Sequence, residues 1–199
     1  MSAYWSISGV TDSLVGLLDT HITQSGDSQI KGVPVSDGSP KDVREDLGTT
    51  HRGISVWLYR VTRNPDLLNA PPTREAADEL PYHPLPVDLH YLVTPLAGDR
   101  DDEQVLFGRV LQVLNDHTII RGTDLVSPPL DPERVELRVL LDTLSLEDLT
   151  RVWNALQESY ALSIGYVVQV VEIESHHEPR HTSPVVVRED GYHQIVASR

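Results

Sequence analysis

The feature that most constrains the fold is a helical pattern that runs directly into a strand pattern, within residues 145–173. In its first part, apolar residues recur at positions 146, 149, 153, 156 and 160, the spacing of one face of an α-helix. Ser145 stands where an N-cap is expected, and Glu147 and Asp148 follow in the first turn, where carboxylates favour the positive helix end. This pattern predicts a helix whose Trp153 face packs onto a sheet.

The second part, residues 164–173, predicts a strand with apolar residues on both faces. Strict alternation places one set on the first face (Ile164, Tyr166, Val168 and Val170) and another on the second (Val167, Val171 and Ile173). A strand that is apolar on both faces belongs in the middle of a sheet that is covered on both sides. We therefore expect this helix–strand unit to mark the core.

The rest of the chain gives a mixed order of elements. The expected helices are a first one around 10–22 and a second one at 101–115, capped by Asp101 with Gln104. The core face expected for the second helix comprises Leu106, Val110, Val113 and Leu114. Strands are expected at 53–61, 85–94, 118–121 and 135–141, and a short one in the patch of Ile30, Val33 and Val35. Two long loops remain, 24–52 and 64–84, and residues 74–80 could form one or two helical turns. The order predicts an α+β fold: a single domain over residues 1–174, with helices against a mixed or mostly antiparallel sheet.

Residues 175–199 are polar and have no helical period, so we expect an extended C-terminal arm. Its only β-prone patch is Val185, Val186 and Val187, which could join an exposed sheet edge.

Composition excludes several classes of protein. With 16 basic and 30 acidic residues the net charge is −14, which disfavours nucleic-acid binding. The absence of cysteine excludes thiol nucleophiles, disulfides and cysteine-ligated metals. No run approaches the roughly 20 apolar residues that span a bilayer, and the first residues lack a signal-peptide pattern, so we expect a soluble protein made in the cytoplasm. The Asp-rich, Lys-poor composition fits either a high-salt cytoplasm or a GC-rich genome.

Few residues are candidates for chemistry. Asp88 and His90 share a strand face and could act as an acid–base pair, but no nucleophile motif or phosphate loop accompanies them. We interpret them as polar residues on the less buried side of the strand. His176, His177 and His181 could ligate a metal, but Pro179 opposes the helix that would align them. The acidic residues 98–103 lack EF-hand spacing and fit a helix start. We therefore expect no catalytic residue, cofactor or metal.

Three stretches resemble a known family: VWLYRVTRNPDLLN (56–69); LPVDLHYLVTPL (85–96) with DDEQVLFGRVLQVLNDHTII (101–120); and LRVLLDTLSLEDLTRVWNALQESYALSIGYVVQVVEI (137–173). Together they resemble the N-terminal domain family of tail-terminator, or cap, proteins from extracellular contractile injection systems of the antifeeding-prophage type. The resemblance runs from about Val10 to Glu174, with Val87 standing where the family pattern has leucine.

The resemblance implies a structural protein rather than an enzyme. Such proteins form a ring, generally a hexamer, that ends the inner tube and anchors the last sheath layer. The implied partners are further copies of the chain, the tube protein and the sheath protein, within a phage-tail-like particle. The candidate sheath contact is Val185, Val186 and Val187 of the arm. The candidate interface loop holds Arg63, Asn64, Asp66 and Asn69. Two alternatives stay open: a baseplate or adaptor component of the same particle, and a small-molecule enzyme that uses the Asp88/His90 face.

Overall fold

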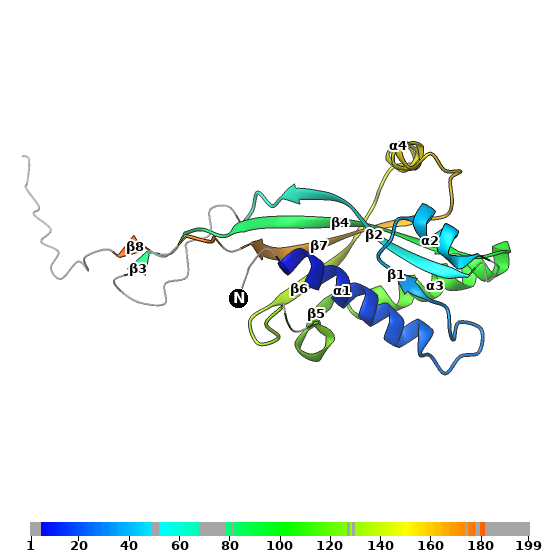
Figure 1. Ribbon diagram of the computed structural model, residues 1–199, viewed down its shortest axis with the longest axis horizontal. Helices are drawn as coiled ribbons and strands as arrows, with labels where there is room; N and C mark the ends of the chain where they lie inside the picture. The colour runs from blue at the N-terminus through cyan, green and yellow to red at the C-terminus, as the bar shows by residue number, and fades with distance from the viewer. Residues whose placement is uncertain are drawn as a thin grey trace, which may run out of the picture.

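A six-stranded sheet forms the frame of the molecule (Figure 1). The computed structural model describes residues 5–48, 52–67, 79–80, 82–126, 128, 130–173, 175–177 and 180–181. In spatial order the strands are β1 (Val35–Ser36), β2 (Gly53–Arg63), β4 (Leu85–Leu96), β7 (Ile164–Ile173), β6 (Glu136–Asp142) and β5 (Ile119–Arg121). The β1–β2 pair is parallel and the other neighbouring pairs are antiparallel. The predicted α+β class with a mixed sheet is confirmed, and β7 lies inside the sheet as expected.

The main core lies between one face of this sheet and two long helices. These are α1 (Ser6–Leu18), which continues as the π-helix η2 (Asp19–Thr23), and α3 (Arg100–Asp116). The predicted core face of α3 is confirmed in full: its buried residues are Leu106, Val110, Val113 and Leu114. Apolar residues recur at helical spacing on the helices and at alternate positions on β4, so both surfaces lose water when they meet.

A buried hydrogen bond ties α1 to the centre of the sheet. The Thr11 hydroxyl lies 2.8 Å from the Tyr91 hydroxyl of β4, and the Tyr91 side chain is fully buried. Burial raises the pKa of Tyr91 to about 12, because the ionised phenolate would lose its hydration. Tyr91 therefore stays neutral and hydrogen-bonded throughout the physiological pH range.

The opposite face of the sheet carries the helix α4 (Leu146–Leu156). Ser145 caps it as predicted, accepting from the Asp148 N–H. Trp153 is only 2% exposed, packs with Leu92 of β4 and donates from Nε1 to the Ser163 hydroxyl at 3.2 Å. The helix is shorter than predicted because Gln157 adopts a left-handed conformation (φ 57°) that ends it before position 160.

Local features of two other elements differ from the sequence predictions. The loop expected at 24–52 contains a helix, α2 (Pro40–Leu47), which starts with a Ser39–Asp42 capping box and Pro40 at its first position. The sequence analysis missed it because only Pro40 and Val43 on it are buried. The N-cap of α3 is Asp99 rather than Asp101: the Asp99 carboxylate accepts from the Asp102 N–H at 2.9 Å.

A register shift in the β4–β7 pair changes which residues of β7 face the core. Val87 lies opposite Val171, but Leu89 lies opposite Val168, so β7 holds one extra residue between these pairs. As a result, Val171 joins Tyr166 and Val168 in the main core. The predicted assignment of Val171 to the other face is wrong, because strict alternation ignores bulges.

Beyond the sheet, the β4–β7 ladder is prolonged by a small antiparallel pair. Here β3 (Glu79–Leu80) lies opposite β8 (Arg180–His181), with Leu80 opposite Arg180, while Leu85 lies opposite Ile173 nearer the body. Figure 1 shows this β3–β8 ribbon projecting at one end of the molecule. Residues 79–80 are therefore a strand and not part of a helical turn. The rest of the expected arm, including Val185, Val186 and Val187, lies outside the described residues, so the domain boundary at 174 stays a prediction.

Candidate assembly surfaces

His90 is the centre of a polar network on the sheet face that carries α4. Its Nδ1 lies 3.0 Å from an Asp142 carboxylate oxygen, and its Nε2 lies 2.9 Å from the Thr62 hydroxyl. The Arg60 guanidinium is 3.2 Å from Nδ1, and Tyr59 meets the ring edge-on. This geometry suits an imidazole that donates to Asp142 and accepts the Thr62 hydroxyl proton. The network thereby links β2, β4 and the end of β6 from which the chain enters α4.

Asp88 and His90, which the sequence analysis considered as a possible acid–base pair, have different partners. Asp88 accepts a hydrogen bond from the Asn64 side-chain amide at 2.8 Å, while the carboxylate on His90 is Asp142. His90 is also only 8% exposed, so its expected place on a less buried side is wrong. The order carboxylate, imidazole, hydroxyl is that of an acid–base relay. With both ring nitrogens engaged and the ring buried, however, we interpret the network as a structural tie.

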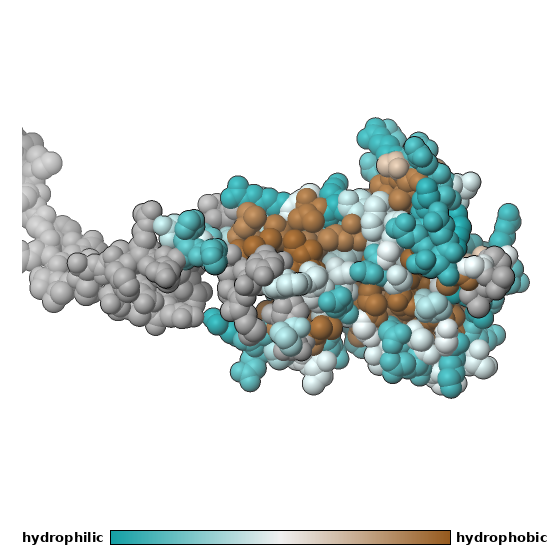
Figure 2. Space-filling model, in the orientation of Figure 1, coloured by the Kyte–Doolittle hydropathy of each residue, from teal (hydrophilic) through white to brown (hydrophobic). Residues whose placement is uncertain are grey.

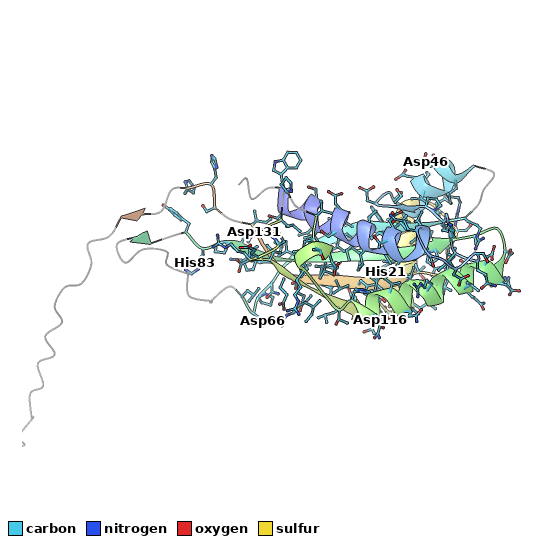
Figure 3. All side chains as sticks on the ribbon, turned by 90° about the horizontal axis from the view of Figure 1, so that it is seen from below. His21, Asp46, Asp66, His83, Asp116 and Asp131 are labelled. Atoms are coloured by element: carbon cyan, nitrogen blue, oxygen red, sulfur yellow. The ribbon has the colours of Figure 1, made fainter. Side chains whose placement is uncertain are left out.

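The candidate interface loop begins where β2 ends. Asn64 is 6% exposed, and its side-chain oxygen accepts from the backbone N–H groups of Asp66 (3.0 Å) and Leu67 (3.2 Å), which turns the chain. Asn64 is therefore occupied within its own chain. Arg63 and Asp66 are exposed (Asp66 is labelled in Figure 3), and Asn69 lies outside the described residues. The interface role of this loop stays a prediction. Among those of its four candidate residues that the structure describes, only Arg63 and Asp66 have exposed side chains that could contact a partner.

Exposed apolar side chains gather near the same end of the sheet. Val61 of β2 is 46% exposed and Leu85 of β4 is 44% exposed. Figure 2 shows apolar surface over the half of the sheet nearest the β3–β8 ribbon, away from α4. Trp5, the residue before α1, is 53% exposed. A contiguous apolar patch, as opposed to single exposed residues, is typical of a surface that another protein covers.

A shallow groove of about 370 Å³ lies between the C-terminal half of α3 and the strands β6 and β7. Its lining is mostly apolar and comprises Leu111, Gln112, Leu114, Asn115, Thr118, Val139, Leu141 and Tyr166. Leu141, at the rim of this groove, is 52% exposed.

The described residues offer no cluster of three or more side chains that could hold a metal ion. His176 and His177 are exposed, and the His177 ring lies against Tyr82 with 5.1 Å between centroids. The side chain of His181 is not among those described. None of the helices in the described ranges has both the length and the apolar character needed to cross a bilayer.

Comparison with known proteins identifies the family of this chain. A family model described as the Pvc16 N-terminal domain matches residues 9–187. The chain belongs to this family. The resemblance drawn from the three sequence stretches is thus confirmed, and the family match extends past 174 into the expected arm. No curated protein sequence matches the chain.

Two solved structures share the fold. The first is the PVC sheath/tube terminator of an extracellular contractile injection system in its extended state, with a TM-score of 0.64 and 17% identity over 97% of this chain. The second is the anti-feeding prophage cap, described as a tube terminating cap, with a TM-score of 0.61 and 20% identity over 92% of this chain. The chain spans 65% and 60% of the lengths of these two proteins.

The sequence analysis missed Asp142, Arg60 and Thr62 as partners of His90. Asp142 is 52 residues away from His90 along the chain, and no spacing rule joins two strands that meet only through the order of the sheet. A clue was present in the alternation itself: Arg60, Thr62 and His90 all interrupt otherwise apolar strands.

Proposed function

We propose that the chain is a structural cap, or tail terminator, of a contractile injection system. In this role, copies of the chain form a ring, most simply a hexamer, that ends the inner tube and anchors the last sheath layer. The observation that carries the proposal is the family match over residues 9–187. The two terminator structures support it through the fold.

The surfaces of the molecule are compatible with an assembly role. A terminator needs one surface that fits a polymerising tube and another that refuses further addition. Exposed Val61, Leu85 and Trp5 supply apolar contact area at one end. The net charge of −14 supplies repulsion against unselective association.

The geometry gives little support to the alternative of a small-molecule enzyme on the Asp88/His90 face. Asp88 is engaged by Asn64, and His90 is buried between Thr62 and Asp142. A general base must reach a substrate proton, and a ring held on both nitrogens does not offer that access. The second alternative, a baseplate or adaptor component, differs from the cap in its position within the particle.

Deletion of the gene in its own system tests the proposal. We expect overlong or unstable tubes and sheaths in electron micrographs, restored to uniform length by the intact gene. A particle-borne tag on the chain should label the end opposite the baseplate. Tubes of normal and uniform length without the chain would refute a cap, and labelling at the baseplate would favour the baseplate or adaptor alternative.

A further inference from the structure

Among the described residues, the outer edge of β2 is paired only near its beginning. On the inner side, β4 pairs with β2 from Gly53 to Arg63. On the outer side, β1 pairs with β2 only at Ile54 and Ser55. The helix α2 lies at the beginning of this edge, where the Leu47 side chain packs against Gly53. Within the described ranges, no strand continues the line of β1 along residues 56–63.

Backbone hydrogen bonds show which groups of β2 point outward. The Ile54 N–H donates outward to Pro34, whereas the Asn64 N–H donates inward to Pro86 of β4. Direction alternates along a strand and shifts by one at the irregularity between Leu58 and Arg60. Beyond β1, the outward-facing backbone groups therefore belong to Val56, Leu58, Val61 and Arg63. Such a row of unpaired donors and acceptors is a template for one more strand.

The side chains of the open edge are apolar and basic. Val61, Arg60 and Arg63 are all exposed. The chain also contains a segment of complementary chemistry after β8: three β-branched residues at 185–187, followed by Arg188 and then by the carboxylates Glu189 and Asp190. Glu189 follows Val185 by four positions, and Thr62 follows Leu58 by the same number. If Val185 lies opposite Leu58, Glu189 therefore lies opposite Thr62. A strand that runs parallel to β2, as β1 does, would therefore bring the two carboxylates towards Arg60 and Arg63.

We propose that the open edge of β2 receives residues 184–190 of a second copy of the chain. The segment takes up the line where β1 stops and runs parallel to β2. Main-chain hydrogen bonds supply the affinity, and the valines and the two carboxylates fix the register. This inference rests on the self-association in the proposed function and deepens it by naming both sides of one contact between neighbouring subunits.

The length of the chain favours a second copy over the same chain. Only residues 182–184 separate His181 from Val185, which at full extension reach about 14 Å. The β3–β8 ribbon projects beyond the sheet (Figure 1). The distance to be covered runs from Arg180, opposite Leu80, back to Leu58, opposite Tyr91. Leu80 and Tyr91 are 11 residues apart along the chain. At about 3.3 Å per residue this is roughly 35 Å of extended strand. In a head-to-tail arrangement, the segment reaches the β2 edge of a neighbouring copy without folding back over its own chain. Repetition of this contact can close a ring.

Disulfide trapping tests the contact directly, because the chain has no cysteine of its own. Full chains that carry Val61→Cys are mixed with larger, tagged chains that carry Arg188→Cys, the position opposite Val61 in this register, under mild oxidation. The mixed dimer is resolved by size on a non-reducing gel. We expect it to form at least 10-fold faster than in a control in which Thr150→Cys, an exposed position on α4, replaces Val61→Cys. Adding Val186→Pro to the tagged chain should reduce trapping to the control rate, because it removes a ladder donor outside the folded sheet.

Trapping at the control rate would overturn the proposal, and so would trapping only within single chains that carry both cysteines. Either failure is distinguishable from failure of the cap function. Tubes of correct length that depend on the gene, but without the mixed dimer, would leave the cap in place and remove the strand exchange. Abnormal tube length does not enter the trapping readout.

Discussion

The two faces of the sheet are stabilised in different ways. Against α1 and α3 the sheet buries a continuous apolar core of strand and helix residues. On the other face α4 covers a smaller cluster around Leu92 and Trp153, and the neighbouring area is held by the polar network of His90. The first face gains stability from area removed from water, which tolerates small shifts in position. The second face depends on a few directional contacts, so its single residues should carry larger shares.

The largest effect should come from the anchor of α4. Trp153→Ala leaves a large cavity against Leu92 and also leaves the Ser163 hydroxyl without its donor. We expect a loss of about 3–5 kcal/mol in the free energy of unfolding, measured by chemical denaturation. Leu146→Ala on the same helix is the matched control, since Leu146 is 70% exposed. It should change stability by less than about 0.5 kcal/mol. Equal losses in both variants would mean that α4 is anchored elsewhere.

A smaller effect should follow loss of the polar tie. His90→Ala removes the partner of both Asp142 and Thr62, and we expect it to cost about 1–3 kcal/mol. Asp142→Ala and the double variant complete a thermodynamic cycle. If the tie is what holds β6 to β4, the two losses should be strongly non-additive. Fully additive losses would show that the two side chains act independently, and a catalytic role would require an activity that His90→Ala abolishes.

The smallest effect should be a pH dependence of stability, set by a histidine on the side of the sheet that packs against α1 and α3. His21 lies beside the C-terminal end of α3, near Asp116 (Figure 3), and its ring is 4.6 Å from that of His117. Desolvation lowers the pKa of His21 below its ordinary value of 6.5, with further lowering from His117 and Arg109. In the unfolded chain His21 takes up a proton near pH 6.5, whereas in the folded protein it resists doing so.

Stability should therefore be complete above about pH 6.5 and fall as the pH drops through that value. Melting temperatures at pH 7.5 and pH 5.5 measure the change, and His21→Asn should reduce the difference between them. A variant with an unchanged difference would mean that other groups set the acid sensitivity. The polar face offers a control, because Thr62→Val alters the His90 network without touching His21.

Local pattern was enough to predict most of the fold, because the amphipathic spacing and caps that encode it are short-range. The core face of α3, the Ser145 cap and the burial of Trp153 all follow from residues within a few turns of one another. Membership of the family also followed from the sequence, because the three stretches that carry it keep their order and spacing.

Tertiary structure alone decided the features that depend on strands meeting across the sheet. The extra residue that turns Val171 to the core exists only as a mismatch between β4 and β7. His90 finds Asp142 only because the strand order places β7 alone between β4 and β6. The open edge of β2 likewise depends on where β1 stops, and the last β1 residue paired with β2 is Ser36, opposite Ser55. Each is a relation between distant segments, and a one-dimensional pattern carries no information about which edges and registers those segments will share.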